Sequence, residues 1–127
     1  MNNLSEHEIQ SAFFRWCEFP PTLEKYPEVK GFFAVPNGIR TVNIRIAVKA
    51  KAEGLRRGVP DTFLPVARGE YYGLFIEFKT PKNYLSRDQK EWFKWLKNEG
   101  FKCEIAKSTD EAIKITEDYL ELKRGQI

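Results

Sequence analysis

The fold of this chain is predicted most clearly by one segment, Tyr71-Tyr72-Gly73-Leu74-Phe75-Ile76-Glu77-Phe78-Lys79. Its nearly continuous apolar character predicts a strand in the middle of a sheet, covered on both faces. Pro81 ends the strand because proline has no N–H for a strand ladder. Glu77 and Lys79 are two positions apart, so their side chains leave the same face of an extended strand. A carboxylate and an ammonium are costly to desolvate on such a strand, so we expect them to serve chemistry.

The segments on either side of this strand predict its neighbours in the sheet. Residues 86–100 carry a helix pattern, with Ser86 as N-cap, Gln89 at the capping-box position and Gly100 as the stop. A strand over 101–106 follows, which makes a βαβ unit with parallel pairing. On the N-terminal side, a strand over 62–66 and a loop over 67–70 form a hairpin with the 71–79 strand. This hairpin brings the strand that follows Asp61 next to the strand that carries Glu77.

The remaining segments complete an α/β order. Ser5 and Glu8 form a capping box for a helix that runs to about Phe19, and a short strand over 32–35 closes at Pro36-Asn37-Gly38. Residues 20–30 look like a proline-rich loop, and a helix near 109–123 ends the chain, followed by a frayed tail over 124–127. The predicted order is α-β-(α)-β-β-α-β-α, an α/β sandwich with a mixed β-sheet flanked by helices.

The bracketed helix is an ambiguous segment over residues 42–53. Val42, Ile44, Ile46 and Val48 alternate with other residues as they would in a strand. The alanines within the segment and the closing Gly54 favour a helix with a glycine stop. We predict the helix.

Length and composition suit a single domain over 1–127. The chain is 42% hydrophobic and 31% charged, with no apolar run long enough for a membrane span and no signal-peptide pattern at its start. Cys17 and Cys103 make no disulfide framework, and His7 is the one histidine, which excludes a histidine-based zinc site. We therefore expect a cytoplasmic protein with reduced thiols and no membrane partner.

Positive charge is concentrated before the Asp61 motif. Between Gly38 and Gly58 there are six basic residues and one acidic residue, Glu53. The basic residues are Arg40, Arg45, Lys49, Lys51, Arg56 and Arg57. This segment is either a solvated basic face or a phosphate-binding surface, and its continuity with Gly58-Val59-Pro60-Asp61 favours the second.

Two carboxylates beside a lysine indicate metal-assisted hydrolysis. Hard oxygen ligands suit Mg²⁺ or Mn²⁺, and Asp61 and Glu77 would supply them, with the carbonyl of Phe78 as a further ligand. Lys79 would orient a water or stabilise negative charge in the transition state. The alternatives are a salt bridge between Glu77 and Lys79 on a half-exposed strand, and a turn role for Asp61 after Pro60.

The first helix offers another acidic ligand. At 100° per residue, Glu6 lies about 50° from the centre of the apolar stripe, and Gln10 lies one turn further along the same edge. Glu8 falls on the solvent side and suits capping. The alternative for Glu6 is a first-turn acid favoured by the helix dipole. Gln89 could be a cap or could also touch substrate or metal-bound water.

Together these residues resemble the PD-(D/E)XK nuclease signature and, more narrowly, the VRR-NUC domain. The resemblance covers nearly the whole chain and depends on several elements in order. They are Glu6 with Gln10, Pro36-Asn37-Gly38 with Arg40, Lys51-Ala52-Glu53-Gly54, Gly58-Val59-Pro60-Asp61, residues 76–80, and Ser86 with Gln89.

The resemblance implies a restriction-endonuclease-like core and Mg²⁺- or Mn²⁺-dependent hydrolysis of DNA phosphodiesters, including branched DNA and Holliday junctions, by a homodimer. It implies Glu6, Asp61 and Glu77 as metal ligands and Lys79 as the catalytic lysine. We expect nucleic-acid contacts from Gln10, Arg40, Lys49, Lys51, Arg56, Arg57 and Gln89. The alternatives are a non-catalytic binder of branched DNA on a nuclease fold, or a phosphodiesterase that acts on RNA or nucleotides.

Overall fold

The computed structural model describes residues 4–36 and 43–124, and within them the chain forms one mixed sheet. The strand order is β1-β2-β3-β4, with β1 at Phe33–Ala34, β2 at Thr62–Leu64, β3 at Leu74–Phe78 and β4 at Lys102–Ala106. β1, β2 and β3 pair antiparallel, and β3 pairs parallel with β4. The predicted parallel βαβ unit is confirmed. The hairpin is confirmed too, but its strands are shorter than the predicted 62–66 and 71–79, and its connection runs over 65–73 instead of 67–70.

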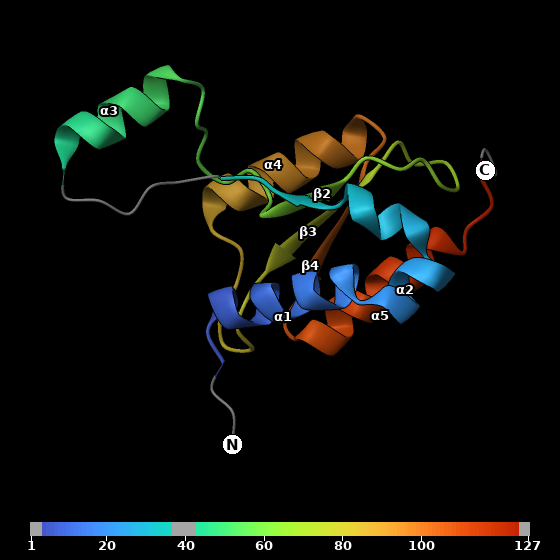
Figure 1. Cartoon of the computed structure of the whole chain (residues 1–127). Helices are drawn as coiled ribbons and strands as arrows, with labels where there is room; N and C mark the ends of the chain where they lie inside the picture. Colours follow the sequence, from blue (N-terminus) through green and yellow to red (C-terminus); the bar gives the residue numbers. More distant parts are fainter. Residues whose placement is uncertain (1–3, 37–42, 125–127) are drawn as a thin grey trace.

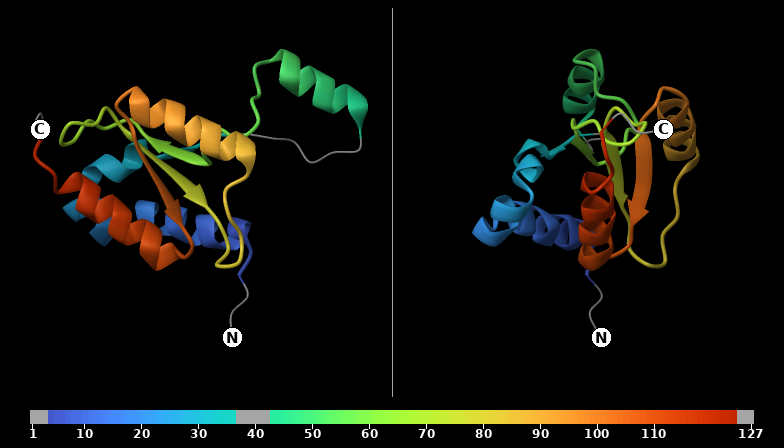
Figure 2. Two further views of the ribbon diagram at one scale, coloured as in Figure 1. Left: turned by 180° about the vertical axis from the view of Figure 1, so that it is seen from behind. Right: turned by 90° about the vertical axis from the view of Figure 1, so that its right-hand side faces the viewer.

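Helices cover the two faces of this sheet (Figures 1 and 2). Helices α1 (Glu6–Glu18) and α5 (Thr109–Leu120) lie on one face, and α4 (Arg87–Asn98) lies on the other. The capping boxes predicted at Ser5 and Ser86 both form. At Ser108 the hydroxyl caps α5, but the Glu111 carboxylate accepts from the Lys107 N–H instead of completing the box. The fold class is confirmed as α/β with a mixed sheet.

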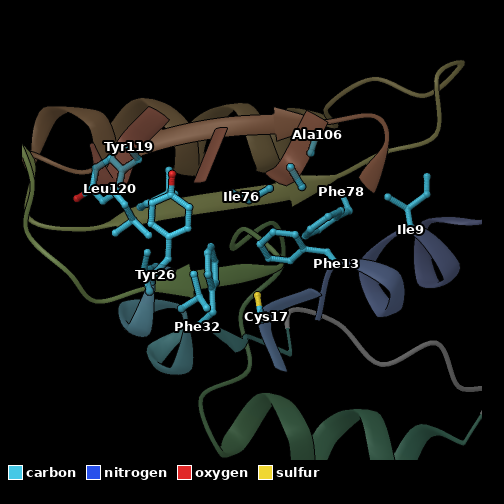
Figure 3. Packing of buried hydrophobic residues seen from close by; sticks show 14 residues of the cluster. Ile9, Phe13, Cys17, Tyr26, Phe32, Ile76, Phe78, Ala106, Tyr119 and Leu120 are labelled. Atoms are coloured by element: carbon cyan, nitrogen blue, oxygen red, sulfur yellow. The ribbon is translucent and has the colours of Figure 1, made fainter. Parts of the chain in front are cut away.

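Successive side chains of β3 point to opposite faces of the sheet, so the hydrophobic core has one part on each face. Leu74, Ile76 and Phe78 pack against α1 and α5. Figure 3 shows Phe78 beside Phe13 of α1. Their ring centroids lie 5.6 Å apart. Phe75 points to the opposite face, where it packs with Phe93 of α4 and Cys103. Glu77 shares that second face, so its carboxylate lies on the side of the sheet that α4 covers.

Residues 20–30, predicted as a loop, instead form helix α2 (Pro20–Lys25) and most of the 3₁₀ helix η1 (Pro27–Gly31). The prolines occupy first-turn positions, where their missing N–H groups have no partner to lose. Burial of Thr22 and Val29 then ties these turns to the core.

The ambiguous segment forms helix α3 (Ile44–Ala52), as predicted. Its N-cap Asn43 accepts hydrogen bonds from the N–H groups of Arg45 and Ile46, and Gly54 follows its end with a φ of 98°. α3 has no buried residue and stands away from the sheet in Figure 1. The turn predicted at Pro36-Asn37-Gly38 extends beyond the described residues.

Candidate active site

Two carboxylates meet where β2 begins and β3 ends. β2 pairs Thr62 with Ile76, so the next position along the register sets Asp61 opposite Glu77. The Asp61 N–H donates to Glu77 Oε1 at 3.1 Å, and the Phe78 N–H donates to Asp61 Oδ2 at 2.8 Å. Each carboxylate therefore accepts a hydrogen bond from the backbone of the other strand, and the hairpin itself positions the pair.

The Glu77 carboxyl is almost fully buried, with 2% of the residue exposed. Burial and the nearby Asp61 carboxylate raise the pKa of Glu77 to about 9, against an opposing effect of the Lys79 ammonium. A carboxyl in this setting holds its proton at neutral pH unless a cation stabilises the charged form.

The Gly58-Val59-Pro60 segment explains why Asp61 reaches this position. Gly58 has a φ of 86°, and a Cβ there would lie 2.7 Å from the carbonyl carbon of Asp88. Only glycine fits both the backbone conformation and this contact. Pro60 is fully buried, and the Asp61 carbonyl accepts from the Val35 N–H at 2.7 Å. The motif thus fixes Asp61 between β1, β3 and the start of α4.

Gln89 in the first turn of α4 supplies the third hydrogen bond to the pair. Its Nε2 donates to Glu77 Oε2 at 2.9 Å, while its Oε1 accepts from the Ser86 N–H at 2.8 Å. The residue is a cap, as predicted, and it also contacts Glu77, which the sequence did not predict.

Lys79 continues the strand beyond Glu77 and is half-buried. Its backbone N–H donates to the Ala106 carbonyl at 3.0 Å, which keeps the chain extended so that residues 77 and 79 share a face. Within residues 4–36 and 43–124, no ion pair joins Glu77 to Lys79, so the simple salt-bridge alternative is not what the structure shows.

Glu6 is not brought together with the carboxylate pair. It begins α1 on the other face of the sheet, where its Oε2 accepts from Asn83 Nδ2 at 3.0 Å, and Gln10 is half-buried on the same helix. Among the described residues, no group of three or more His, Cys, Asp or Glu side chains could hold a metal ion. No sequence pattern indicated the Asn83 contact, because it joins distant parts of the chain.

The family follows from comparison with known proteins. A sequence model of the family described as "VRR-NUC domain" matches residues 4–110. This chain belongs to the VRR-NUC domain family. A solved structure titled "VRR_NUC domain protein" is similar at a TM-score of 0.79 and 29% sequence identity, covering 98% of this chain and 94% of that chain. No curated protein matches the sequence.

Membership places this VRR-NUC chain in a nuclease family, and divalent metal use is typical of such nucleases. The residues fit a hard cation, since Asp61 and Glu77 offer carboxylate oxygens and their mutual repulsion would be relieved by positive charge. Mg²⁺ often takes only one or two protein carboxylates and fills its other positions with water and substrate oxygens. A two-carboxylate site is therefore chemically sufficient.

The basic residues of the VRR-NUC chain lie beside this site and on α3. Arg56 and Arg57 are exposed immediately before Gly58, and Arg57 lines a shallow hollow with Asp88, Glu91 and Trp92. Lys49 and Lys51 are exposed on α3, whereas Arg40 falls outside the described residues. Within residues 4–36 and 43–124, no helix is long and apolar enough to cross a membrane.

Proposed function

We propose that this protein is a Mg²⁺- or Mn²⁺-dependent DNA endonuclease that hydrolyses phosphodiester bonds of branched DNA, with Holliday junctions as candidate substrates. The observation that supports this most directly is the hydrogen-bonded pair of Asp61 and Glu77, with Lys79 on the same strand face. Family membership supports the same chemistry.

Each residue has a defined part in the proposed reaction. Asp61 and Glu77 would hold the ion, with the Phe78 carbonyl as a further oxygen. A bound ion supplies Lewis-acid polarisation of the phosphoryl group and a more acidic water. Lys79 orients the attacking water and stabilises the negative charge that develops on the phosphoryl oxygens. Glu6 would have to move from its present position, where its Oε2 accepts from the Asn83 amide, to join this set.

The basic residues supply substrate affinity. Lys49, Lys51, Arg56, Arg57 and the preceding Arg40 would neutralise backbone phosphates, which positions DNA without reading its sequence. Such contacts suit an enzyme that selects a branched shape over a base sequence. Gln10 would add a contact from α1.

We also propose a cytoplasmic homodimer. Two symmetry-related sites can cut two strands of one junction, which needs a closed two-fold arrangement. The exposed apolar side chains of α3 are the surface that a second copy would cover, and the buried free thiols of Cys17 and Cys103 suit a reducing compartment.

The test is cleavage of a four-way junction, a linear duplex and an RNA hairpin by wild-type protein and two variants, with and without Mn²⁺. Asp61→Ala and Glu77→Ala should each reduce junction cleavage by more than the roughly 10–100-fold expected for loss of an outer-shell partner. Both should bind the junction like wild type, because neither residue is expected to carry a phosphate contact.

Asp118→Asn is the matched control, since this exposed carboxylate on α5 forms an ion pair with Lys114 of the same helix. Full activity of either alanine variant would refute the assignment. Binding without cleavage by the wild type would favour a non-catalytic junction binder, and preferential cleavage of RNA would favour the RNA phosphodiesterase.

A further inference from the structure

The side-chain amide of Gln89 joins the start of α4 to the Glu77 carboxylate. Its Nε2 lies 2.9 Å from Glu77 Oε2, and its Oε1 lies 2.8 Å from the backbone nitrogen of Ser86. These two neighbours fix which way the amide points. The Ser86 N–H can only donate, so the amide oxygen must face it, and the amide nitrogen must then face Glu77.

The helix end that carries this amide is itself immobilised. The Gln89 N–H donates to Ser86 Oγ at 3.2 Å, which completes the capping box. The backbone of Asp88 lies directly against Gly58, in the loop that leads to Asp61. One turn further on, Phe93 is buried against the sheet. The Nε2 donor is therefore held in place by packing as well as by hydrogen bonds.

Glu77 receives one donor on each oxygen, and the two donors come from different elements. The Asp61 N–H binds Oε1 from the edge of β2, and Gln89 Nε2 binds Oε2 from α4. Two fixed donors set the plane of the carboxylate and the direction of its remaining lone pairs. Outer-shell hydrogen bonds of this kind orient metal-binding carboxylates and tune their affinity.

We propose that Gln89 is a positioning residue that orients the Glu77 carboxylate for a divalent cation and does not contact DNA. The proposal rests on the proposed nuclease function. It differs from the expectation drawn from the sequence, in which Gln89 binds nucleic acid. The amide oxygen and one amide hydrogen are already bonded within the fold, so a DNA contact would have to compete with both.

Two variants separate the role of Gln89 in the capping box from its contact with the Glu77 carboxylate. Gln89→Met keeps the side-chain length but removes the amide, and Ser86→Ala removes the other half of the same capping box while leaving the amide in place. Mn²⁺ affinity is measured by titration calorimetry without DNA. Junction affinity is measured in metal-free buffer, and cleavage is measured over a range of Mn²⁺ concentrations.

Gln89→Met should weaken Mn²⁺ binding about 10–100-fold. Its cleavage should approach the wild-type rate at saturating Mn²⁺, and its junction affinity should be unchanged. Ser86→Ala and Gln89→Met should lower the melting temperature to a similar extent, because each removes half of the capping box. Ser86→Ala should nevertheless keep wild-type Mn²⁺ affinity. Gln89→Ala should repeat the Gln89→Met result and serves if the methionine variant is poorly folded.

Wild-type Mn²⁺ affinity in both Gln89 variants would overturn the proposal. Weaker junction binding by these variants in metal-free buffer would also overturn it, because Gln89 would then be a DNA contact. An equal loss of Mn²⁺ affinity in Ser86→Ala would also overturn it, since the cap alone would then explain the effect. These results are separate from failure of the nuclease function, which would appear as wild-type protein that neither binds Mn²⁺ nor cuts any substrate.

Discussion

At the residue scale, the fold favours the protonated form of Glu77, whereas the proposed metal binding needs its carboxylate ionised. Folding buries this carboxyl beside Asp61 and raises its pKa from 4.5 to about 9. The folded state therefore holds the proton more tightly than the unfolded state between those two pH values. It follows that the free energy of unfolding falls as pH rises from 4.5 towards 9, with a slope of up to about 1.4 kcal/mol per pH unit.

Glu77→Gln should remove this pH dependence, because a neutral amide of the same shape replaces the titrating carboxyl. Without divalent metal, the urea midpoint of the variant should therefore change little between pH 5 and pH 8, whereas that of wild type should fall. Urea unfolding followed by circular dichroism across pH 5–9 measures this. A wild-type midpoint that does not fall relative to that of the variant between pH 5 and pH 8 would contradict the raised pKa.

Position 58 is one that only glycine can occupy without strain, because of the positive φ of Gly58 and its contact with Asp88. Gly58→Ala should destabilise the fold by about 1–3 kcal/mol from its left-handed backbone conformation alone, and further through the close contact with Asp88. Gly54→Ala is the matched control, because Gly54 also has a positive φ but nothing lies within 4 Å of its added Cβ. Denaturant unfolding of both variants makes the comparison. Equal losses would mean that the Asp88 contact contributes nothing.

At the element scale, α3 and the segment after it form a basic arm on the molecule. A nine-residue helix with no buried side chain is marginal in water, so its stability depends on its Asn43 cap and on contacts with the second copy in the proposed homodimer. Its exposed Lys49 and Lys51 lead through Arg56 and Arg57 to the carboxylate pair. We therefore expect DNA that binds along this arm to extend towards the site.

Removing Arg56 and Arg57 tests this arrangement. The double variant Arg56→Ala/Arg57→Ala should bind junctions and duplexes more weakly to a similar degree. The slope of log K against log salt should become shallower by roughly 1 for each arginine that contacts a phosphate. Fluorescence anisotropy over a salt series measures the slope. Lys114→Ala on α5 is the control, and an unchanged slope in the arginine variant would remove these residues from the DNA interface.

At the scale of the whole molecule, α3 exposes an apolar surface. Ile44, Ile46 and Val48 are 77%, 48% and 61% exposed, which is unusual for large apolar residues on so short a helix. In the proposed homodimer a second copy covers part of this surface. The sheet and its helices then present two catalytic sites related by a two-fold axis.

Ile44→Asp/Val48→Asp should convert a dimer into a monomer, because a carboxylate buried without a partner is strongly unfavourable. Sedimentation velocity at several protein concentrations measures the oligomeric state. Trp95→Asp is the control, since Trp95 is an exposed apolar residue on α4 and lies outside the proposed interface. Dissociation by the Trp95 variant but not by the α3 variant would move the interface to α4.

The sequence alone determined the parts of this protein that depend on near neighbours. The apolar run before Phe78, the capping boxes at Ser5 and Ser86, and the antiparallel pairing of the strand after Asp61 with the strand of Glu77 were predicted correctly. The register that sets Asp61 opposite Glu77 was not, because the connection is longer than the predicted loop over 67–70. Each of the correctly predicted features follows from side-chain periodicity, cap chemistry or a short loop, and such rules act over a few residues.

The tertiary structure alone decided how the carboxylates are held and which residues stay away from them. Gln89 and Asn83 reach their partners across gaps in the chain that no local rule spans, and α1 places Glu6 on the face opposite Glu77. The helical turns between Pro20 and Gly31 likewise form because Thr22 and Val29 are buried. Packing of the helices on the two faces of the sheet sets these contacts, and packing depends on the whole chain at once.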